Sequence, residues 1–349
     1  MSMRDKDRQE MNPIVSGQEK KKKKGKLWKI FLLLILLLLL AYFALVNFLV
    51  SAALIPSFMR KFSFFEEITE KSINEQIHTD DIEANLAAGT DSYHEWLDSM
   101  DFQRETLVSE DGYELVASYL ASKEEDSHLW ALVLHGYTGW KEAMYPYARM
   151  YYRRGYHCII PDLRTQGESE GDYIGMGWTD HYDCMLWIDR ILQMDPEARI
   201  VIHGQSMGAA TALLMSGEEE LSDHVKAVVS DAAYTDAYSM FGEKLTAWFS
   251  LPPFPIVDTA VLMLKLRGGY DLMDASPIDA VKKSETPTLF IHGDLDAMIS
   301  VDMAYRLYDA ARCEKDLLIV EGAGHAQCKD KDPDQFVKKV FEFISSYME

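Results

Sequence analysis

A serine flanked by two glycines is the feature that most constrains this chain. Gly204-Gln205-Ser206-Met207-Gly208 directly follows the short apolar run 199–203 and directly precedes the helix-forming run 209–215. In so sharp a turn between a strand and a helix, larger side chains at the two glycine positions would collide with neighbouring backbone. The turn holds the serine hydroxyl above the sheet and places the next amide at the positive end of a helix. The pattern therefore predicts a serine nucleophile.

Strand-like and helix-like segments alternate from Asp101 to the C-terminus. This alternation predicts an α/β fold with a mostly parallel sheet, helices on both faces and a leading antiparallel hairpin. Strands are predicted at 102–109, 113–121, 129–134, 156–160, 199–203, 225–230, 288–291 and 317–320, and helices at 141–154, 177–193, 207–215, 301–311 and 335–347.

The segment between residues 230 and 288 is longer than one crossover helix requires, and it is rich in bulky apolar side chains. A small helical cap over about 232–285 would explain both its length and its composition.

The N-terminal part contains an uninterrupted apolar stretch over residues 30–50, in which only Asn47 is polar. As a helix, this stretch is long enough to cross the roughly 30 Å hydrocarbon core of a membrane. Lys20 to Lys24 precede it and should stay on the cytoplasmic side, so the chain after the stretch would lie on the extracytoplasmic side. We expect a basic cytoplasmic tail over 1–29 and a transmembrane anchor over 30–55.

A cleaved signal peptide is the alternative, because Val50-Ser51-Ala52 would suit a signal peptidase. The apolar core of such peptides usually runs about 7 to 15 residues, which is shorter than the stretch found here. Residues 56–100 are interpreted as a stalk or a helical lead-in to a catalytic domain over 101–349. Their aromatic residues are Phe62, Phe64, Phe65, Tyr93 and Trp96.

The distribution of charged residues also separates the predicted cytoplasmic tail, 1–29, from the rest of the chain. The whole chain carries a formal net charge of −21, with +6 on residues 1–29 and −27 on the remainder. An acidic catalytic part argues against nucleic acid as a partner, and its simplest role is to keep an exported domain soluble. The four cysteines are scattered and do not indicate a disulfide framework. Asp330, Asp332 and Asp334 lack the turn glycine of a calcium loop, so we expect no metal site.

A serine hydroxyl needs a base to become nucleophilic, and the base needs an acid that orients it. The strand 288–291 runs into His292-Gly293-Asp294-Leu295-Asp296, and the strand 317–320 runs into a loop that ends at His325. Both loops follow strand ends at the edge where open α/β sheets place their sites. His325 is the candidate base, and Asp296, Asp294 and Asp231 are the candidate acids.

From about Asp101 onward the chain resembles the α/β-hydrolases of the serine-aminopeptidase-like and esterase-like branch. The resemblance rests on G-x-S-x-G, on H-G-x-x-D at 292–296, on G-x-G-H ending at His325 and on H-G-x-x-G at 135–139. It implies that Asp296 is the acid and His325 the base, and that the N–H groups of Tyr137 and Met207 form an oxyanion hole. Several members of this branch are bacterial proteins with an N-terminal membrane anchor, as expected here.

The predicted function is therefore hydrolysis of carboxylic esters by Ser206, His325 and Asp296 through an acyl-enzyme, with no cofactor. The apolar cap favours a small to medium-sized acyl or aryl ester. A serine peptidase acting on short peptides and a catalytically inactive, membrane-tethered binding module are the alternatives. The remaining motif residues are expected to be structural. They are His135, His181, His203 and His292, together with Arg164, which should brace loops.

Overall fold

The computed structural model describes residues 13–59, 93–124 and 126–349, which fall into two units, 1–48 and 49–349. Helix α1, Pro13–Leu54, begins in the first unit and ends in the second. Within the described residues, one helical stretch, Lys26–Leu54, is apolar and long enough to cross a membrane, and a signal sequence would have the same character. Phe62, Phe64 and Phe65 of the predicted stalk or lead-in lie outside the described residues, and so do residues 1–12 of the predicted tail.

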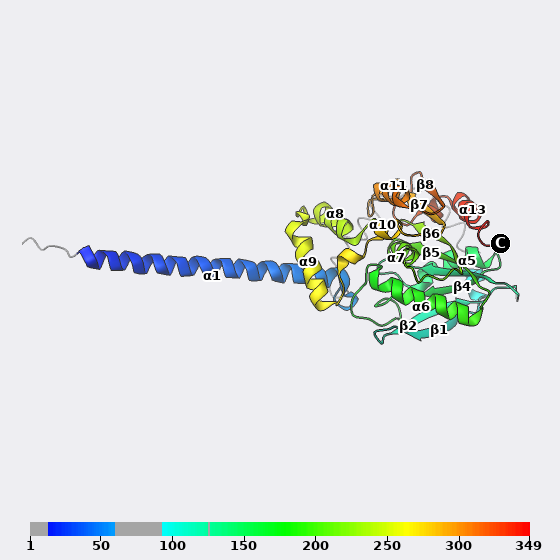
Figure 1. Ribbon diagram of the computed structural model, residues 1–349, viewed down its shortest axis with the longest axis horizontal. Helices are drawn as coiled ribbons and strands as arrows, with labels where there is room; N and C mark the ends of the chain where they lie inside the picture. The colour runs from blue at the N-terminus through cyan, green and yellow to red at the C-terminus, as the bar shows by residue number, and fades with distance from the viewer. Residues whose placement is uncertain (1–12, 60–92, 125) are drawn as a thin grey trace, which may run out of the picture. The chain divides into compact units, whose positions relative to one another are not determined.

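The second unit is built on one mixed sheet (Figure 1), in the order β1-β2-β4-β3-β5-β6-β7-β8 within the described residues. β1 and β2 form the predicted antiparallel hairpin, β2 also pairs antiparallel with β4, and the remaining pairs are parallel. The predicted α/β-hydrolase sheet is confirmed. The strands are β1 Gln103–Val108, β2 Glu114–Leu120, β3 Leu129–Leu134, β4 His157–Pro161, β5 Arg199–Gln205, β6 Val225–Asp231, β7 Thr288–Gly293 and β8 Lys315–Val320.

Helices cover both faces of this sheet. Helices α5, Tyr145–Tyr152, and α13, Pro333–Ile344, share a core with the strand residues Val133, Ile160 and Val229. Successive strand residues point to opposite faces, and the alternate positions, such as Leu132, are also fully buried. The other face is covered by α6, Trp178–Met194, α7, Met207–Ser216, and α11, Val301–Ala310. Residues 93–98 are helical, and Trp96 packs edge-on against Phe102 beside the first core.

One predicted helix is divided. The sequence predicts a single helix over 141–154, but the structure has a 3-10 turn, η1, at Lys141–Met144, followed by α5. Pro146 explains the break, because a proline lacks the N–H that a helix interior needs and is accommodated in a first helical turn. Lys141 is held in this turn by Asp162, whose carboxylate accepts from its backbone N–H at 2.7 Å and from its ammonium at 2.8 Å.

The predicted cap lies between β6 and β7. It contains α8, Ala237–Phe249, and α9, Pro253–Arg267, followed by the short turns η2, Leu272–Asp274, and α10, Pro277–Ala280. Asp236 begins α8 by accepting a hydrogen bond from Ser239 N at 2.7 Å. Helices α8 and α9 pack on each other and present apolar side chains to the cavity described below.

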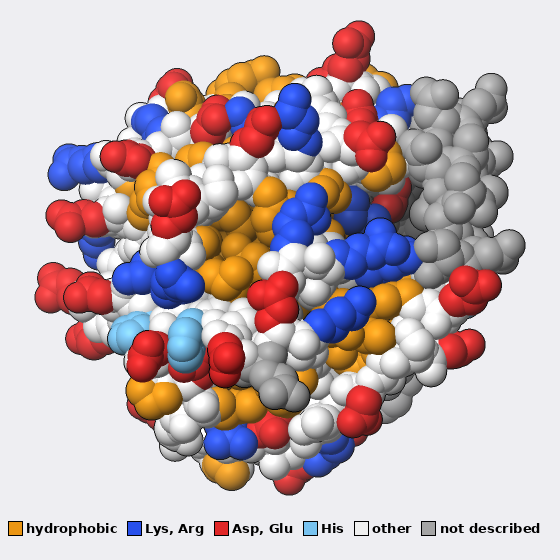
Figure 2. Space-filling view, turned by 90° about the vertical axis from the view of Figure 1, so that its right-hand side faces the viewer, with side chains coloured by type: hydrophobic (Ala, Val, Ile, Leu, Met, Phe, Trp, Pro, Cys, Tyr) orange, Lys and Arg blue, Asp and Glu red, His pale blue; other side chains and the backbone are white. Residues whose placement is uncertain are grey.

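The four cysteines are free, and Cys158 is buried in β4 as its apolar surroundings predict. Figure 2 shows one face of the molecule, on which acidic and basic side chains are interspersed. On this face the excess of negative charge is not gathered into one acidic patch, which agrees with a general role in solubility.

Candidate active site

Ser206 lies at the turn between β5 and α7, and its backbone is strained. Its φ is +56° and its ψ is −117°, a conformation that residues with side chains rarely adopt. The glycines on either side allow the turn. A Cβ on Gly204 would lie 2.1 Å from the carbonyl oxygen of Gly208, and one on Gly208 would lie 2.4 Å from that of Leu134. The steric argument made from the sequence therefore holds at both positions.

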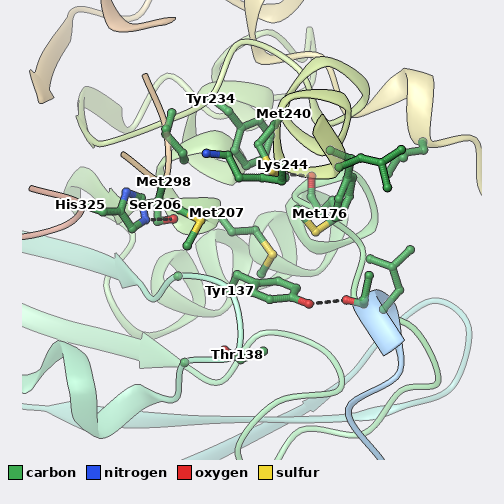
Figure 3. Close-up of a pocket in the computed structure, with 18 of the residues that line it drawn as sticks. Tyr137, Thr138, Met176, Ser206, Met207, Tyr234, Met240, Lys244, Met298 and His325 are labelled. Carbon is green, nitrogen blue, oxygen red and sulfur yellow. Dashed lines mark hydrogen bonds between the residues drawn. The ribbon is translucent and has the colours of Figure 1, made fainter. Parts of the chain in front are cut away.

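Two short hydrogen bonds connect the serine to a buried carboxylate. Ser206 Oγ lies 2.8 Å from His325 Nε2 (Figure 3), and His325 Nδ1 lies 2.8 Å from Asp296 Oδ2. Because a carboxylate only accepts, Nδ1 donates to Asp296 and Nε2 is left to accept from the serine hydroxyl. Asp296 and His325 come from the loops after β7 and β8, so the structure brings together the three residues that the motifs indicated.

The carboxylate of Asp296 is held in its ionised form. Burial opposes ionisation, but the electrostatic interaction with His325 and hydrogen bonds with His292 and His325 lower the pKa of Asp296 well below its usual range. The second oxygen, Oδ1, accepts from the N–H groups of Met298 at 2.8 Å and Ile299 at 2.7 Å. All four contacts fix the orientation of the carboxylate toward His325.

His292 has a larger part in this arrangement than the sequence indicated. Its Nε2 lies 2.9 Å from the carbonyl oxygen of Ile299, the loop contact that was expected, and also 3.1 Å from Asp296 Oδ2. Burial lowers the pKa of His292, but its hydrogen bond and proximity to Asp296 outweigh that effect and raise the pKa overall. The spacing of four residues in H-G-x-x-D is the signal that could have indicated this contact, but the sequence analysis used the motif only to identify the acid.

The two other candidate acids are occupied elsewhere. Asp294 Oδ1 accepts from Gly322 N at 2.6 Å and thereby joins the loops that carry Asp296 and His325. Asp231 Oδ2 accepts from the Tyr147 hydroxyl at 3.4 Å, and burial raises the pKa of Asp231 to about 7. Among the three candidate carboxylates, the one that hydrogen-bonds His325 is Asp296.

The two predicted oxyanion residues lie beside Ser206. Met207 is the first residue of α7, so its N–H has no acceptor within the helix and lies at the positive end of the helix dipole. The loop 135–139 passes close to the serine, since a Cβ on Gly136 would lie 3.1 Å from Ser206 Cβ. Tyr137 and Met207 line the same cavity as Ser206 and His325.

That cavity has a volume of about 520 Å³ and is largely apolar. Its walls come from the loop 135–139, from the cap helices α8 and α9, and from residues 49–54 at the end of α1. Within the described residues that line it, Lys244 is the only Lys, Arg, Asp or Glu, and its ammonium donates to the carbonyl oxygen of Ala297 at 2.7 Å.

Residues 49–54 were missed as part of the site by the sequence reasoning. Three contacts hold this segment in place: Tyr137 Oη donates to the carbonyl oxygen of Ala53 (Figure 3), Ile174 N donates to that of Leu54 at 2.9 Å, and Arg267 donates to Ser51 Oγ at 3.2 Å. The apolar side chains of this segment continue those of the stretch before it, so composition gave no sign that its end packs into a catalytic pocket.

The residues expected to be structural do hold loops and core. His135 donates from Nδ1 to the carbonyl oxygen of Gly136 and accepts at Nε2 from Leu163 N. His203 is buried beside the Tyr151 hydroxyl, and burial lowers its pKa to about 3. Arg164 makes two 2.7 Å hydrogen bonds to Asp183 and a third, at 2.9 Å, to Asp111. His181 is buried near Glu218, 3.3 Å away.

Comparisons with known proteins agree with this architecture. A profile of the alpha/beta hydrolase fold matches residues 132–255. The chain is 30% identical over 261 residues to the uncharacterized protein YqkD of Bacillus subtilis, covering 74% of this chain and 85% of that protein. Its structure is similar to that of the Pyrococcus furiosus esterase Pf2001, with a TM-score of 0.59, 20% identity and coverage of 72% and 94%.

A peptidase is also among the similar structures. The acylaminoacyl peptidase of Pyrococcus horikoshii matches with a TM-score of 0.52 and 21% identity, over 71% of this chain and 42% of that one. Esterases and peptidases thus share this fold, and the likeness by itself supports a hydrolase without choosing between them. By its sheet, its cap and its similarity to YqkD over most of both chains, this protein belongs to the α/β-hydrolase fold family.

Proposed function

We propose that this protein is a serine hydrolase that cleaves carboxylic esters through an acyl-enzyme. The observation that carries the proposal is the chain of two 2.8 Å hydrogen bonds from Ser206 through His325 to Asp296, which opens into an apolar cavity. A hydroxyl, an imidazole and a carboxylate in this order are the groups that nucleophilic acyl transfer requires.

In the proposed mechanism, His325 takes the proton of Ser206 as its Oγ attacks the ester carbonyl. Asp296 keeps Nδ1 of the imidazole protonated and stabilises the imidazolium that forms. The N–H groups of Tyr137 and Met207 donate to the oxyanion, and two such donors typically supply several kcal/mol in the transition state. His325 then protonates the leaving alcohol, and it next deprotonates the water that releases the acid.

The charge of the pocket favours an ester over a short peptide. A peptidase that recognises a free amino terminus needs a carboxylate to bind the ammonium of its substrate. Within the described residues that line the cavity there is no Asp or Glu, and Lys244 would repel that ammonium. The peptidase remains the second candidate because an acylaminoacyl peptidase shares the fold.

We further propose that α1 anchors the protein in a membrane, with the catalytic unit on the extracytoplasmic side. The lysines at positions 20–24, before the apolar stretch, support this orientation. The burial of Val50, Ser51 and Ala52 in the catalytic unit supports retention of the segment, because a cut after Ala52 would remove part of the pocket wall.

The test compares the full chain in detergent with its Ser206→Ala variant. Both are assayed on p-nitrophenyl esters and on aminoacyl p-nitroanilides, and both are treated with an active-site-directed fluorophosphonate. We expect ester turnover and labelling in the parent and neither in the variant. Turnover of the anilides alone would assign the protein to the peptidases. A folded parent that reacts with no ester, anilide or phosphonate would be an inactive binding module.

A further inference from the structure

Part of the wall of the cavity beside Ser206 comes from the end of α1. Leu49, Val50, Ala52, Ala53 and Leu54 line the same space as Ser206 and His325. These residues follow Phe48 directly in the chain, and they form the end of the one helical stretch, among the described residues, that is apolar enough to cross a membrane. The end of the apolar stretch therefore lines the same cavity as Ser206 and His325.

The chemistry of the pocket matches a hydrocarbon chain. Cap side chains such as Leu245, Trp248 and Ile256 line the same cavity as Ala53. The volume of about 520 Å³ is within the range of pockets that enclose a whole small ligand, roughly 300–1,000 Å³. Burying apolar surface contributes about 25 cal/mol per Å², so each added methylene of an acyl chain would strengthen binding.

The outer surface of the cap also carries exposed apolar side chains. On α9, Leu262 is 54% exposed and Leu266 is 77% exposed, and their spacing of four residues puts them on one helix face. Phe254, at the start of the same helix, is 72% exposed. Exposed apolar side chains grouped on one element usually mark a surface that meets a partner or a membrane.

We infer that the substrate is a membrane-borne acyl ester, whose chain enters between residues 49–54 and the cap while the Leu262/Leu266 face of α9 contacts the bilayer. This inference rests on the proposed ester hydrolysis and names its substrate class. The bilayer is favoured over another protein because Leu49 is joined directly to the apolar stretch. Residues that line the pocket thus follow the proposed membrane span within a few positions of the sequence.

The experiment uses the full chain in phosphatidylcholine vesicles and two esters of one fluorescent alcohol. 4-Methylumbelliferyl palmitate is dissolved in the vesicles, and 4-methylumbelliferyl butyrate is supplied in solution. The quantity compared is the ratio of palmitate turnover to butyrate turnover. Because both esters release the same alcohol, the ratio isolates the acyl chain and its location.

Two variants test the two surfaces. Ala53→Phe fills the pocket at the wall, and Leu262→Asp combined with Leu266→Asp places charge on the outer face of the cap. Each should lower the ratio roughly tenfold, by blocking the chain or by weakening contact with the bilayer. The control is Val108→Asp on β1, which is 65% exposed and does not line the cavity, and which should change the ratio less than about twofold. If Ala53→Phe fails to fold, the cap pair alone decides, because its side chains are exposed.

The outcomes separate the two proposals. Butyrate turnover with little palmitate turnover, or a cap variant with the parental ratio, would overturn the membrane-borne substrate and leave the esterase intact. A cap variant that changes self-association in sedimentation while keeping the ratio would show that a second copy covers this face, and would also overturn the inference. If the parent hydrolyses neither ester and the phosphonate does not label Ser206, the proposed function itself is wrong.

Discussion

The two sides of the pocket are built by different physical means. The floor consists of Ser206, Met207, His325 and the loop 135–139, and it is fixed by a strained turn, by glycines that tolerate no Cβ and by hydrogen bonds of 2.8 Å. The roof consists of α8, α9 and residues 49–54, and it is held by apolar packing and a few peripheral hydrogen bonds. A floor of this kind holds the polar groups in fixed positions, while the roof supplies most of the apolar surface of the cavity.

The largest expected effect falls on the floor. Ser206→Ala removes the proposed nucleophile and should lower ester turnover roughly a hundred-thousandfold or more, because the residues of a serine triad act as a unit. Steady-state kinetics measures the loss, and thermal unfolding provides the control. Since alanine must adopt the same positive φ, the variant should keep a similar melting temperature. Residual turnover near the parental rate would mean that another group is the nucleophile.

Asp296→Asn should cost roughly a thousandfold to ten-thousandfold in turnover. An amide in this place can donate to Nδ1, which stabilises the wrong tautomer of His325. Asp294→Asn is the matched control, because it lies two residues away and its carboxylate bonds Gly322 N instead of His325. Equal losses in the two variants would show that the loop, and not the pairing with His325, is what matters.

Gly204→Ala should destabilise the fold by roughly 3 kcal/mol or more, since its Cβ would meet backbone that cannot move aside. Gly242→Ala, inside α8 of the roof, is the contrasting change. Its Cβ would lie 3.4 Å from the side chain of Pro253, an ordinary contact, and alanine favours a helix by about 1 kcal/mol over glycine. Urea unfolding of both variants measures the difference between the two sides. A similar loss of unfolding free energy in Gly204→Ala and Gly242→Ala would contradict this difference between floor and roof.

Asp231 lies buried beneath the floor and should make the stability depend on pH. Its pKa is raised to about 7 in the folded state, so the unfolded chain loses this proton near pH 4 while the folded chain retains it. Stability is therefore lost as pH rises from about 4 to about 7. Between pH 5 and pH 8 this group should lower the free energy of unfolding by roughly 2–3 kcal/mol. In Asp231→Asn that decrease should be absent from urea unfolding curves, and an unchanged pH profile would contradict the assignment.

The smallest expected effect belongs to the contact that joins the floor to the roof. Tyr137→Phe removes the hydroxyl that donates to the carbonyl oxygen of Ala53 but keeps the backbone N–H beside Ser206. The loss of one such hydrogen bond should cost about 1 kcal/mol of stability. Turnover of a short soluble ester should change far less than in Asp296→Asn. A loss as large as in that variant would show that the roof contributes to the chemistry.

The same contrast explains what the sequence could predict. The floor depends on backbone sterics, which leave a residue signature, and Gly204, Ser206, Gly208, Asp296 and His325 stand in recognisable order. The strands are similarly evident, because burial on both faces gives continuous apolar runs. The cap was predicted as a small helical insertion from its length and apolar composition, but the bounds of its two helices were not predicted.

The roof contribution of residues 49–54 had no signature at all. An apolar side chain that packs against α9 and one that meets lipid have the same composition, so hydropathy cannot separate them. The sequence prediction of one helix over 141–154 also did not include the break at Pro146, although a proline within a predicted helix is a known sign of a helix start. The role of Asp231 depends on how deeply the sheet end is buried, which emerges only from the fold.

The contact between Arg267 and Ser51, which are 216 positions apart in the chain, also bears on how the protein is made. Ser51 leaves the ribosome early, whereas Tyr137, Ile174, Arg267 and finally His325 follow over the course of translation, at about 5–20 residues per second. The early segment thus reaches its partners only after they too have been synthesised. The pocket and His325 are completed last, so under the proposed mechanism the nascent chain would have no hydrolytic activity until its synthesis is nearly finished.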